Sequence, residues 1–199
     1  MKKFELTSET KINVFGKKLF RIKALISFGC VEAGETGGWV EKEENLSQSG
    51  DAWVYDNAKV YGNAKVYGNA KVCGNAWVYG NAWVYDNAKV CGDALVCGDA
   101  CVRGNAKVCG NAWVCGNAWV CGDADYTTIH GFGTQFRTTT FFRCKDKAVR
   151  VSCGCFFGTI SEFREQVKKT RSGKIAEDYL AIADLMEKHF EKEENHGRR

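Results

Sequence analysis

The sequence predicts a mainly β protein whose central part winds into a single-stranded parallel β-helix. Residues 50–121 form twelve consecutive hexads of the pattern G/D-N/D-A-x-V-Y/C, with no insertion or deletion and with Arg103 as the one exception at the last position. The third residue is always Ala and the fifth is always Val. The chain also contains no proline, a residue that lacks the N–H needed by a continuous ladder of backbone hydrogen bonds.

Each hexad predicts one short strand followed by a corner. Side chains alternate between the two sides of a strand, so Ala and Val share the inward side, and the x and Tyr/Cys positions face outward. The Gly-Asn and Gly-Asp pairs predict the corners, because both residues tolerate a positive φ and Asn or Asp can bond its own backbone. Six residues leave no room for paired hairpin strands, so the period favours a coil.

The hexads resemble those of the hexapeptide-repeat family, through the Val-x-x-Asn-Ala-x spacing seen in "VYGNAK" and "VCGNAW". The resemblance covers residues 50–121 and implies a left-handed coil with three hexads per turn. One departure is that Gly stands two places after the aliphatic residue, where the commoner form has it one place after. Three hexads per turn predict four turns, about 19 Å long at the spacing of about 4.8 Å between stacked strands.

Three hexads per turn also sort the outward x positions into three walls. The first wall reads Trp53, Lys71, Lys89 and Lys107. The second wall reads Lys59, Trp77, Leu95 and Trp113. The third wall reads Lys65, Trp83, Cys101 and Trp119. One wall is therefore a lysine ladder, and the other two are apolar ladders.

These ladders are the candidate binding surfaces. An apolar patch larger than a few hundred Å² usually marks an interface, so three coverings are open: the C-terminal helix, packing between two or three chains, or a protein partner. The lysine ladder has two open interpretations. It is either a solvated face that discourages association between sheets or a surface that binds an anionic partner. The predicted binding residues are Trp77, Trp83, Leu95, Trp113 and Trp119, with Lys71, Lys89 and Lys107.

Most of the eleven cysteines lie in the hexads. Cys73, Cys91 and Cys109 form one predicted column, and Cys97 and Cys115 form another, with Cα atoms close enough for disulfides. An odd count without a secretory signal favours reduced thiols, which behave as small buried apolar side chains. The hexads contain no His and no CxxC pair, so we expect no metal.

Charge and targeting signals narrow the class of protein. The formal net charge is +4, and residues 50–124 carry six basic and six acidic side chains. A neutral repeat body argues against a basic phosphate-binding groove, so we expect no nucleic-acid partner for it. The start "MKKFELTSETKINVF" has no long apolar segment, and no apolar run approaches the ~20 residues of a membrane span. We therefore expect a cytoplasmic protein without a membrane partner.

The resemblance raises the question of catalysis. Acyltransferases of the hexapeptide-repeat family use a His general base on the coil or on an extruded loop, with acyl-CoA between subunits, and its gamma-type carbonic anhydrases use three His ligands. This chain has only His130, His189 and His196, none within the hexads. His130 is the sole candidate base, with no acid or nucleophile near it in sequence. We predict a non-catalytic protein without a cofactor, and a hexapeptide acyltransferase that uses acyl-CoA is the alternative.

Both ends of the coil need caps, because an uncovered end exposes strand edges. Residues 1–49 are predicted to form an N-terminal β cap, with two strands around residues 15–18 and irregular first turns that point Val40 and Leu46 inward. Residues 50–124 are the predicted repeat domain. Residues 125–199 are predicted to form a β-hairpin that turns near residues 145–146, followed by two helices.

The first predicted helix begins at Thr159, where Thr159 and Glu162 form a capping box. Its buried side carries Ile160, Phe163 and Val167. The second spans about residues 174–191, and helical spacing puts these residues on one side: Ile175, Tyr179, Ile182 and Met186. We expect that side to pack on the Trp walls or on the end of the coil.

The whole layout is also similar to a group of uncharacterised hexad-repeat proteins of gut-type bacteria and their mobile elements, through "GGWVEKEENLSQSGDAWVYDNA" and "VSCGCFFGTISEF". That resemblance supports the domain layout and implies no reaction. It suggests a binding scaffold, such as a phage- or element-encoded inhibitor or adaptor that holds a host protein on a rigid face. A structural homo-oligomer without a ligand is the third hypothesis.

Overall fold

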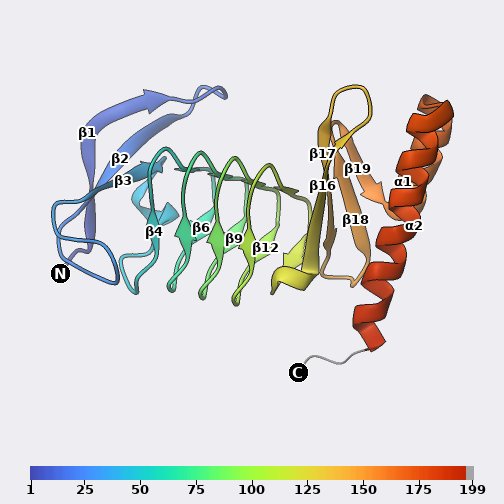
Figure 1. Ribbon diagram of the computed structural model, residues 1–199. Helices are drawn as coiled ribbons and strands as arrows, with labels where there is room; N and C mark the ends of the chain where they lie inside the picture. The colour runs from blue at the N-terminus through green and yellow to red at the C-terminus, as the bar shows by residue number, and fades with distance from the viewer. Residues whose placement is uncertain (196–199) are drawn as a thin grey trace.

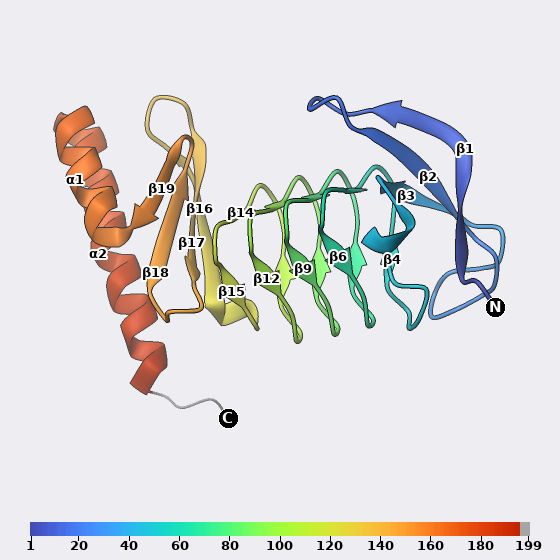
Figure 2. The same ribbon diagram turned by 180° about the vertical axis from the view of Figure 1, so that it is seen from behind.

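A computed structural model describes residues 1–195, with side chains described as far as residue 191. Its parts lie in a row: an N-terminal hairpin, the coiled repeat body, a C-terminal sheet and two helices (Figures 1 and 2). The fold is mainly β, as predicted, and its central part is a parallel β-coil.

The elements outside the repeat have the following bounds: β1 Phe4–Ile12, β2 Lys18–Ala24, β3 Thr36–Val40, the 3₁₀ turn η1 Glu43–Asn45, the 3₁₀ turn η2 Asp123–Asp125, β16 Tyr126–Phe132, β17 Arg137–Arg143, β18 Val149–Cys153, β19 Phe156–Thr159, α1 Ile160–Thr170 and α2 Gly173–Asn195. The repeat contributes twelve two-residue strands: β4 Trp53–Val54, β5 Lys59–Val60, β6 Lys65–Val66, β7 Lys71–Val72, β8 Trp77–Val78, β9 Trp83–Val84, β10 Lys89–Val90, β11 Leu95–Val96, β12 Cys101–Val102, β13 Lys107–Val108, β14 Trp113–Val114 and β15 Trp119–Val120.

Each short strand pairs in parallel with the strand three hexads away. Lys89 pairs with Lys71 on one side and with Lys107 on the other. The backbone N–H of Trp77 donates to the carbonyl of Ala94 at 2.9 Å, and equivalent bonds recur along the coil. This pairing confirms three hexads per turn and arranges the strands into three walls. The left-handed sense of the coil stays a prediction.

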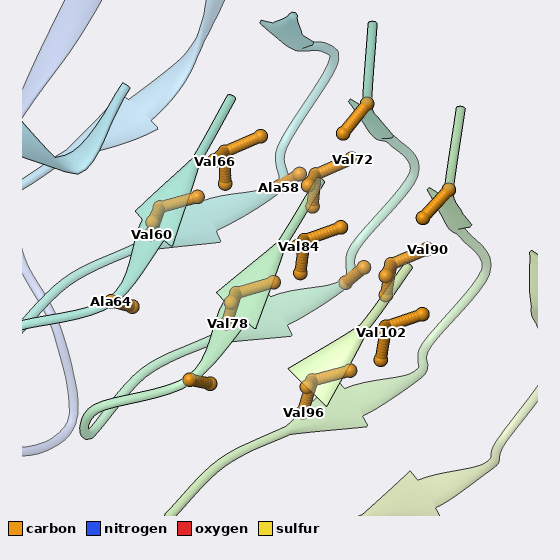
Figure 3. Close-up of a cluster of buried hydrophobic side chains, with 14 of the residues drawn as sticks. Ala58, Val60, Ala64, Val66, Val72, Val78, Val84, Val90, Val96 and Val102 are labelled. Atoms are coloured by element: carbon orange, nitrogen blue, oxygen red, sulfur yellow. The ribbon is translucent and has the colours of Figure 1, made fainter. Parts of the chain in front are cut away.

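The inward Ala and Val side chains form the core of the coil. Each of them is at most 1% exposed. Figure 3 shows Val78, Val84 and Val90, one from each wall, pointing into the space that the walls enclose. Burial of a Val side chain contributes about 1.5–3 kcal/mol, and the small Ala side chains let three walls approach one axis.

The corners depend on positive φ angles and on a ladder of side-chain amides. Gly80 has a φ of +73°, and Asp86 takes the place of this glycine in the next hexad with a φ of +58°. The Asn63 side-chain amide donates to Asn81 Oδ1 at 3.1 Å, and the Asn81 amide donates to Asp99 Oδ1 at 2.9 Å. Side-chain hydrogen bonds at the corners therefore join successive turns, in addition to the backbone hydrogen bonds between the strands.

The coil begins before the first hexad. In β3, Trp39 pairs with Lys59 and Val40 pairs with Val60, both in parallel, and Leu46 forms an isolated parallel bridge. Val40 is fully buried and Leu46 is 2% exposed, which confirms their predicted inward positions. The second wall therefore has five coil strands, β3, β5, β8, β11 and β14.

The N-terminal hairpin extends the sheet of the second wall. Strands β1 and β2 pair antiparallel, and β2 pairs antiparallel with β3, which gives a seven-stranded sheet of order β1-β2-β3-β5-β8-β11-β14. The turn is closed by Asn13, whose Oδ1 accepts from the backbone N–H groups of Phe15 and Lys17, both at 2.9 Å. We call residues 4–24 the hairpin arm, and its tip reaches over the repeat body (Figure 1).

The C-terminal region contains a four-stranded antiparallel sheet of order β16-β17-β18-β19. The prediction of a single hairpin was therefore incomplete: β17 and β18 form that hairpin, and β16 and β19 pair along its two edges. The sheet closes the coil, because Phe142 and Cys144 belong to the core that the inward Val and Ala side chains form.

Both helices pack on the C-terminal sheet. Thr159 caps α1 as predicted: its Oγ1 accepts from the backbone N–H of Glu162 at 3.2 Å, and Glu162 Oε2 accepts from the Thr159 N–H at 2.7 Å. The predicted apolar sides of the two helices contact Phe141 and Val151. They lie on the side of the sheet away from the coil (Figure 2), so the prediction that the second helix covers a Trp wall or the coil end was wrong. No helix in the described part of the chain is both long and apolar enough to cross a bilayer.

Candidate binding surfaces on the three walls

Six strands of the seven-stranded sheet bring their outward residues into one row. Cross-strand pairing links Arg21 to Trp39 and Trp39 to Lys59. It then links Lys59 to Trp77, Trp77 to Leu95, and Leu95 to Trp113 along the second wall. We call this set the outward row: Arg21, Trp39, Lys59, Trp77, Leu95 and Trp113. The row is basic at the end near the hairpin arm and apolar towards the C-terminal sheet.

The hairpin arm covers the beginning of the outward row. The Phe15 ring lies 6.2 Å from the Trp77 ring and 6.3 Å from the Tyr61 ring. The Tyr61 and Tyr79 rings stack with centroids 5.0 Å apart and an interplanar angle of 0°. Leu19 of the arm is fully buried in the same cluster. Trp77 is therefore half-buried within the chain, and its cover is the N-terminal arm rather than the C-terminal helix.

The remainder of the row stays open. Trp113 is 38% exposed, and the tip of the arm presents Val14 at 78% and Phe15 at 61% exposure. The backbone N–H of Trp113 donates to Thr140 Oγ1 at 3.0 Å, which ties this end of the row to β17. The arm tip and the β16–β17 turn rise on the same side of the coil (Figures 1 and 2). Apolar side chains of the second wall therefore remain accessible between the arm tip and the β16–β17 turn.

The third wall holds the other two predicted tryptophans. Trp83 is 46% exposed and Trp119 is half-buried, with the buried Cys101 between them in the ladder. Arg103 and Lys145 lie over the Trp119 ring at 4.8 and 5.2 Å. The five predicted apolar residues therefore form two separate surfaces, with Trp77, Leu95 and Trp113 on one wall and Trp83 and Trp119 on another.

The first wall carries the predicted lysine ladder. Lys71, Lys89 and Lys107 are cross-strand neighbours, and no ion pair joins them to a carboxylate within the described residues. Trp53 at the start of this wall is fully buried, because Phe4 and Phe28 pack edge-on against it at 6.1 and 5.4 Å. This wall therefore exposes charge and no indole.

Two pairs of stacked cysteines have perturbed acidities. The Sγ atoms of Cys91 and Cys109 are 2.6 Å apart. Burial, and then the hydrogen bond with Cys91, raise the pKa of Cys109 to about 12. A hydrogen bond from Cys115 lowers the pKa of Cys97 to about 7, against the opposing effect of burial. No group of three His, Cys, Asp or Glu side chains among the described residues is arranged to hold a metal ion.

The candidate catalytic histidine lies away from the walls. His130 is exposed on β16, and its Nδ1 is 3.1 Å from Thr138 Oγ1. His189 packs its ring 5.2 Å from Phe190 on α2, and His196 lies outside the described residues.

Sequence reasoning missed Arg21 and Trp39 as members of the outward row. Trp39 pairs with Lys59, twenty residues later, whereas the hexads step by eighteen. Extending the hexad frame backwards would therefore place Glu41 in the row. Arg21 joins through antiparallel pairing of the arm, which leaves no trace in the repeat.

Comparison with known proteins supports the architecture of the coil. A family model described as a YdcK beta solenoid repeat matches residues 70–86. The coil is a parallel β-solenoid built from hexad repeats. The solenoid is also similar to a protein of Escherichia coli strain K12 described as the uncharacterized acetyltransferase YdcK, at 38% identity. That match covers 28% of the solenoid chain and 19% of the relative, so the chain spans only part of the protein that it resembles.

Proposed function

We propose that the solenoid is a non-catalytic binding scaffold that holds a protein partner on the open part of the second wall. The observation that carries this proposal is the exposure of Trp113 on the same wall whose other end is covered by the exposed apolar arm tip of Ile12, Val14 and Phe15. Tryptophan and other aromatic residues are enriched at the energetic centres of protein interfaces. An adaptor or an inhibitor of the partner would use the surface in the same way.

The rigidity of the wall supports this function. Hydrogen bonds between turns fix the backbone of every strand in the row, and the stacked Tyr61 and Tyr79 rings hold the adjacent side chains. A preorganised surface loses little conformational entropy when it binds, so more of its contact energy appears as affinity.

Paired variants test the proposal. Trp113→Ser should release the partner, because it removes the most exposed indole of the second wall, whereas Trp83→Ser on the third wall should leave it bound. Both variants keep the inward Val and Ala core, and circular dichroism checks the fold. The measurement is partner retention by immobilised wild type and variants, with sedimentation to detect a second copy of the chain as the partner. Equal retention by Trp113→Ser and wild type would contradict the proposal.

A second candidate function is acetyl transfer from acetyl-CoA. It is favoured by the printed description of the relative as an acetyltransferase, and His130 is the residue that would act as its general base. Isothermal calorimetry with acetyl-CoA tests it directly. Binding, together with turnover that His130→Ala abolishes, would favour the transferase; no heat at millimolar acetyl-CoA would count against it.

A further inference from the structure

Three cations gather where the hairpin arm meets the second wall. Lys11 Nζ lies 3.8 Å from the centroid of the Trp39 ring, and Arg21 Cζ lies 4.9 Å from the same centroid. Lys59 is the cross-strand partner of Trp39, and its Nζ lies 4.8 Å from the Trp77 ring. All three side chains are half-buried.

These cations have no carboxylate partner among the described side chains. In the part of the chain that the structure describes, no carboxylate oxygen lies within 4.0 Å of their nitrogen atoms. Arg21 Nη1 donates to the backbone carbonyl of Asp56 at 3.2 Å. Burial, followed by repulsion from Lys59 and Arg21, lowers the pKa of Lys11 to about 8, and attraction to Glu9 opposes this only in part. The cluster is therefore short of negative charge.

Three N–H and O–H donors in this cluster also lack a hydrogen-bond partner among the described residues. Arg21 Nε, Trp39 Nε1 and the Tyr61 hydroxyl are buried without a hydrogen-bond partner, and Trp39 and Tyr61 are 7% and 5% exposed. A buried donor without a partner costs about 1–3 kcal/mol, so three of them in one cluster indicate an acceptor that the described part of the chain does not supply.

We propose that this arm site, formed by Lys11, Arg21, Trp39, Lys59 and Tyr61, binds an oxyanion, namely a phosphate or carboxylate group. Oxyanions offer several acceptor oxygens to a guanidinium and to ammonium groups, in the strongest class of hydrogen bond that proteins form. The group comes either from a free anion or from an acidic residue of the protein partner. Only the second source rests on the proposed function.

Inorganic phosphate is the probe. Phosphate should raise the Tm of the wild type saturably, beyond the effect of sodium chloride at equal ionic strength, because an anion that binds only the folded state stabilises it. Lys59→Gln should weaken phosphate binding about tenfold or more, as expected for one lost charged hydrogen bond. Lys65→Gln is the matched control, since Lys65 holds the same hexad position on the third wall and also lies over a tryptophan ring, that of Trp83 at 6.0 Å.

A stability measurement without phosphate separates anion binding from misfolding. Lys59→Gln should be at least as stable as the wild type there, because it relieves repulsion between uncompensated cations. The phosphorus NMR signal of phosphate should be broadened by the wild type and by Lys65→Gln, and it should stay sharp with Lys59→Gln. An equal Tm shift in wild type and Lys59→Gln, or one reproduced by sodium chloride, would overturn the proposal.

The two sources of the anion give different results in the partner complex. If the partner supplies a carboxylate, bound partner abolishes the phosphate-dependent Tm shift and Lys59→Gln weakens partner binding. If the anion is free, the shift persists in the complex. Failure of the proposed partner surface appears instead as unchanged partner retention by Trp113→Ser, and phosphate binding does not depend on that outcome.

Discussion

The ring of Phe15 stands edge-on to the indole of Trp77, with centroids 6.2 Å apart and an interplanar angle of 82°. This contact joins the tip of the hairpin arm to the second turn of hexads. It explains why Trp77 is half-buried while Trp113, two turns further along the same ladder, is open. The arm therefore decides how much of the second wall is accessible.

Phe15→Ala should loosen the arm and expose Trp77. An edge-to-face aromatic pair contributes about 0.5–1.5 kcal/mol beyond its buried area, so we expect a loss of about 1 kcal/mol in the free energy of unfolding. Acrylamide should quench a larger fraction of the tryptophan fluorescence. Val14→Ala is the control, since Val14 is 78% exposed; equal quenching in both variants would argue against the covering role of Phe15.

The corner glycines should resist substitution for two reasons that act together. Gly80 has a φ of +73°, and an added Cβ would lie 3.0 Å from the backbone nitrogen of Gly98 in the next turn. A non-glycine residue in the left-handed region costs about 1–3 kcal/mol, so Gly80→Ala should lower the free energy of unfolding by at least that range. Gly122→Ala should have little effect, because Gly122 is extended at φ −155° and has open space around its Cα. Urea unfolding measures both.

Asp86 shows how the repeat tolerates a corner without glycine. Its φ is +58°, and its Oδ2 accepts from the backbone N–H of Gly104 at 3.2 Å. Asp86→Ala should cost about 1–2 kcal/mol, because it loses this bond and leaves alanine at a positive φ. Asp86→Gly loses the bond alone and should cost less. If the glycine variant proves less stable than the alanine variant, this explanation of the corner is wrong.

The lowered pKa of Lys11 predicts a specific pH dependence. The pKa of Lys11 is about 8 in the folded chain and about 10.4 in an unfolded one. Between these values the unfolded chain binds more protons, so this residue makes stability rise with pH. The free energy of unfolding of the wild type should therefore increase relative to that of Lys11→Gln between pH 8 and 10, in denaturation at constant ionic strength. A constant or falling difference would contradict the assignment.

The repeat body could be predicted from the sequence because its rules are local. Every turn repeats the same alternation, so Ala82 and Val84 must be inward, and an eighteen-residue step places Trp77, Leu95 and Trp113 in one ladder. The structure confirms these positions. Thr159 and Glu162 were likewise predictable, since a capping box involves residues three positions apart.

The coverings of the walls could not be predicted, because they depend on contacts between distant segments. Phe4 and Phe28 bury Trp53, and Phe15 covers Trp77, although no periodic pattern connects these pairs. The amphipathic side of α2 indicated that it packs on something, but not whether that partner was the coil or the C-terminal sheet. The arm site was missed for the same reason: Lys11 and Arg21 reach Trp39 through antiparallel pairing of the arm.

Oxidative footprinting of the partner complex tests the central claim most directly. Hydroxyl radicals modify accessible aromatic side chains, and mass spectrometry reports the rate at each residue with and without the partner. Binding on the second wall predicts protection of Trp113 and Phe15 and an unchanged rate at Trp83, which is 46% exposed on the third wall. Protection of Trp83 with an unchanged rate at Trp113 would contradict it.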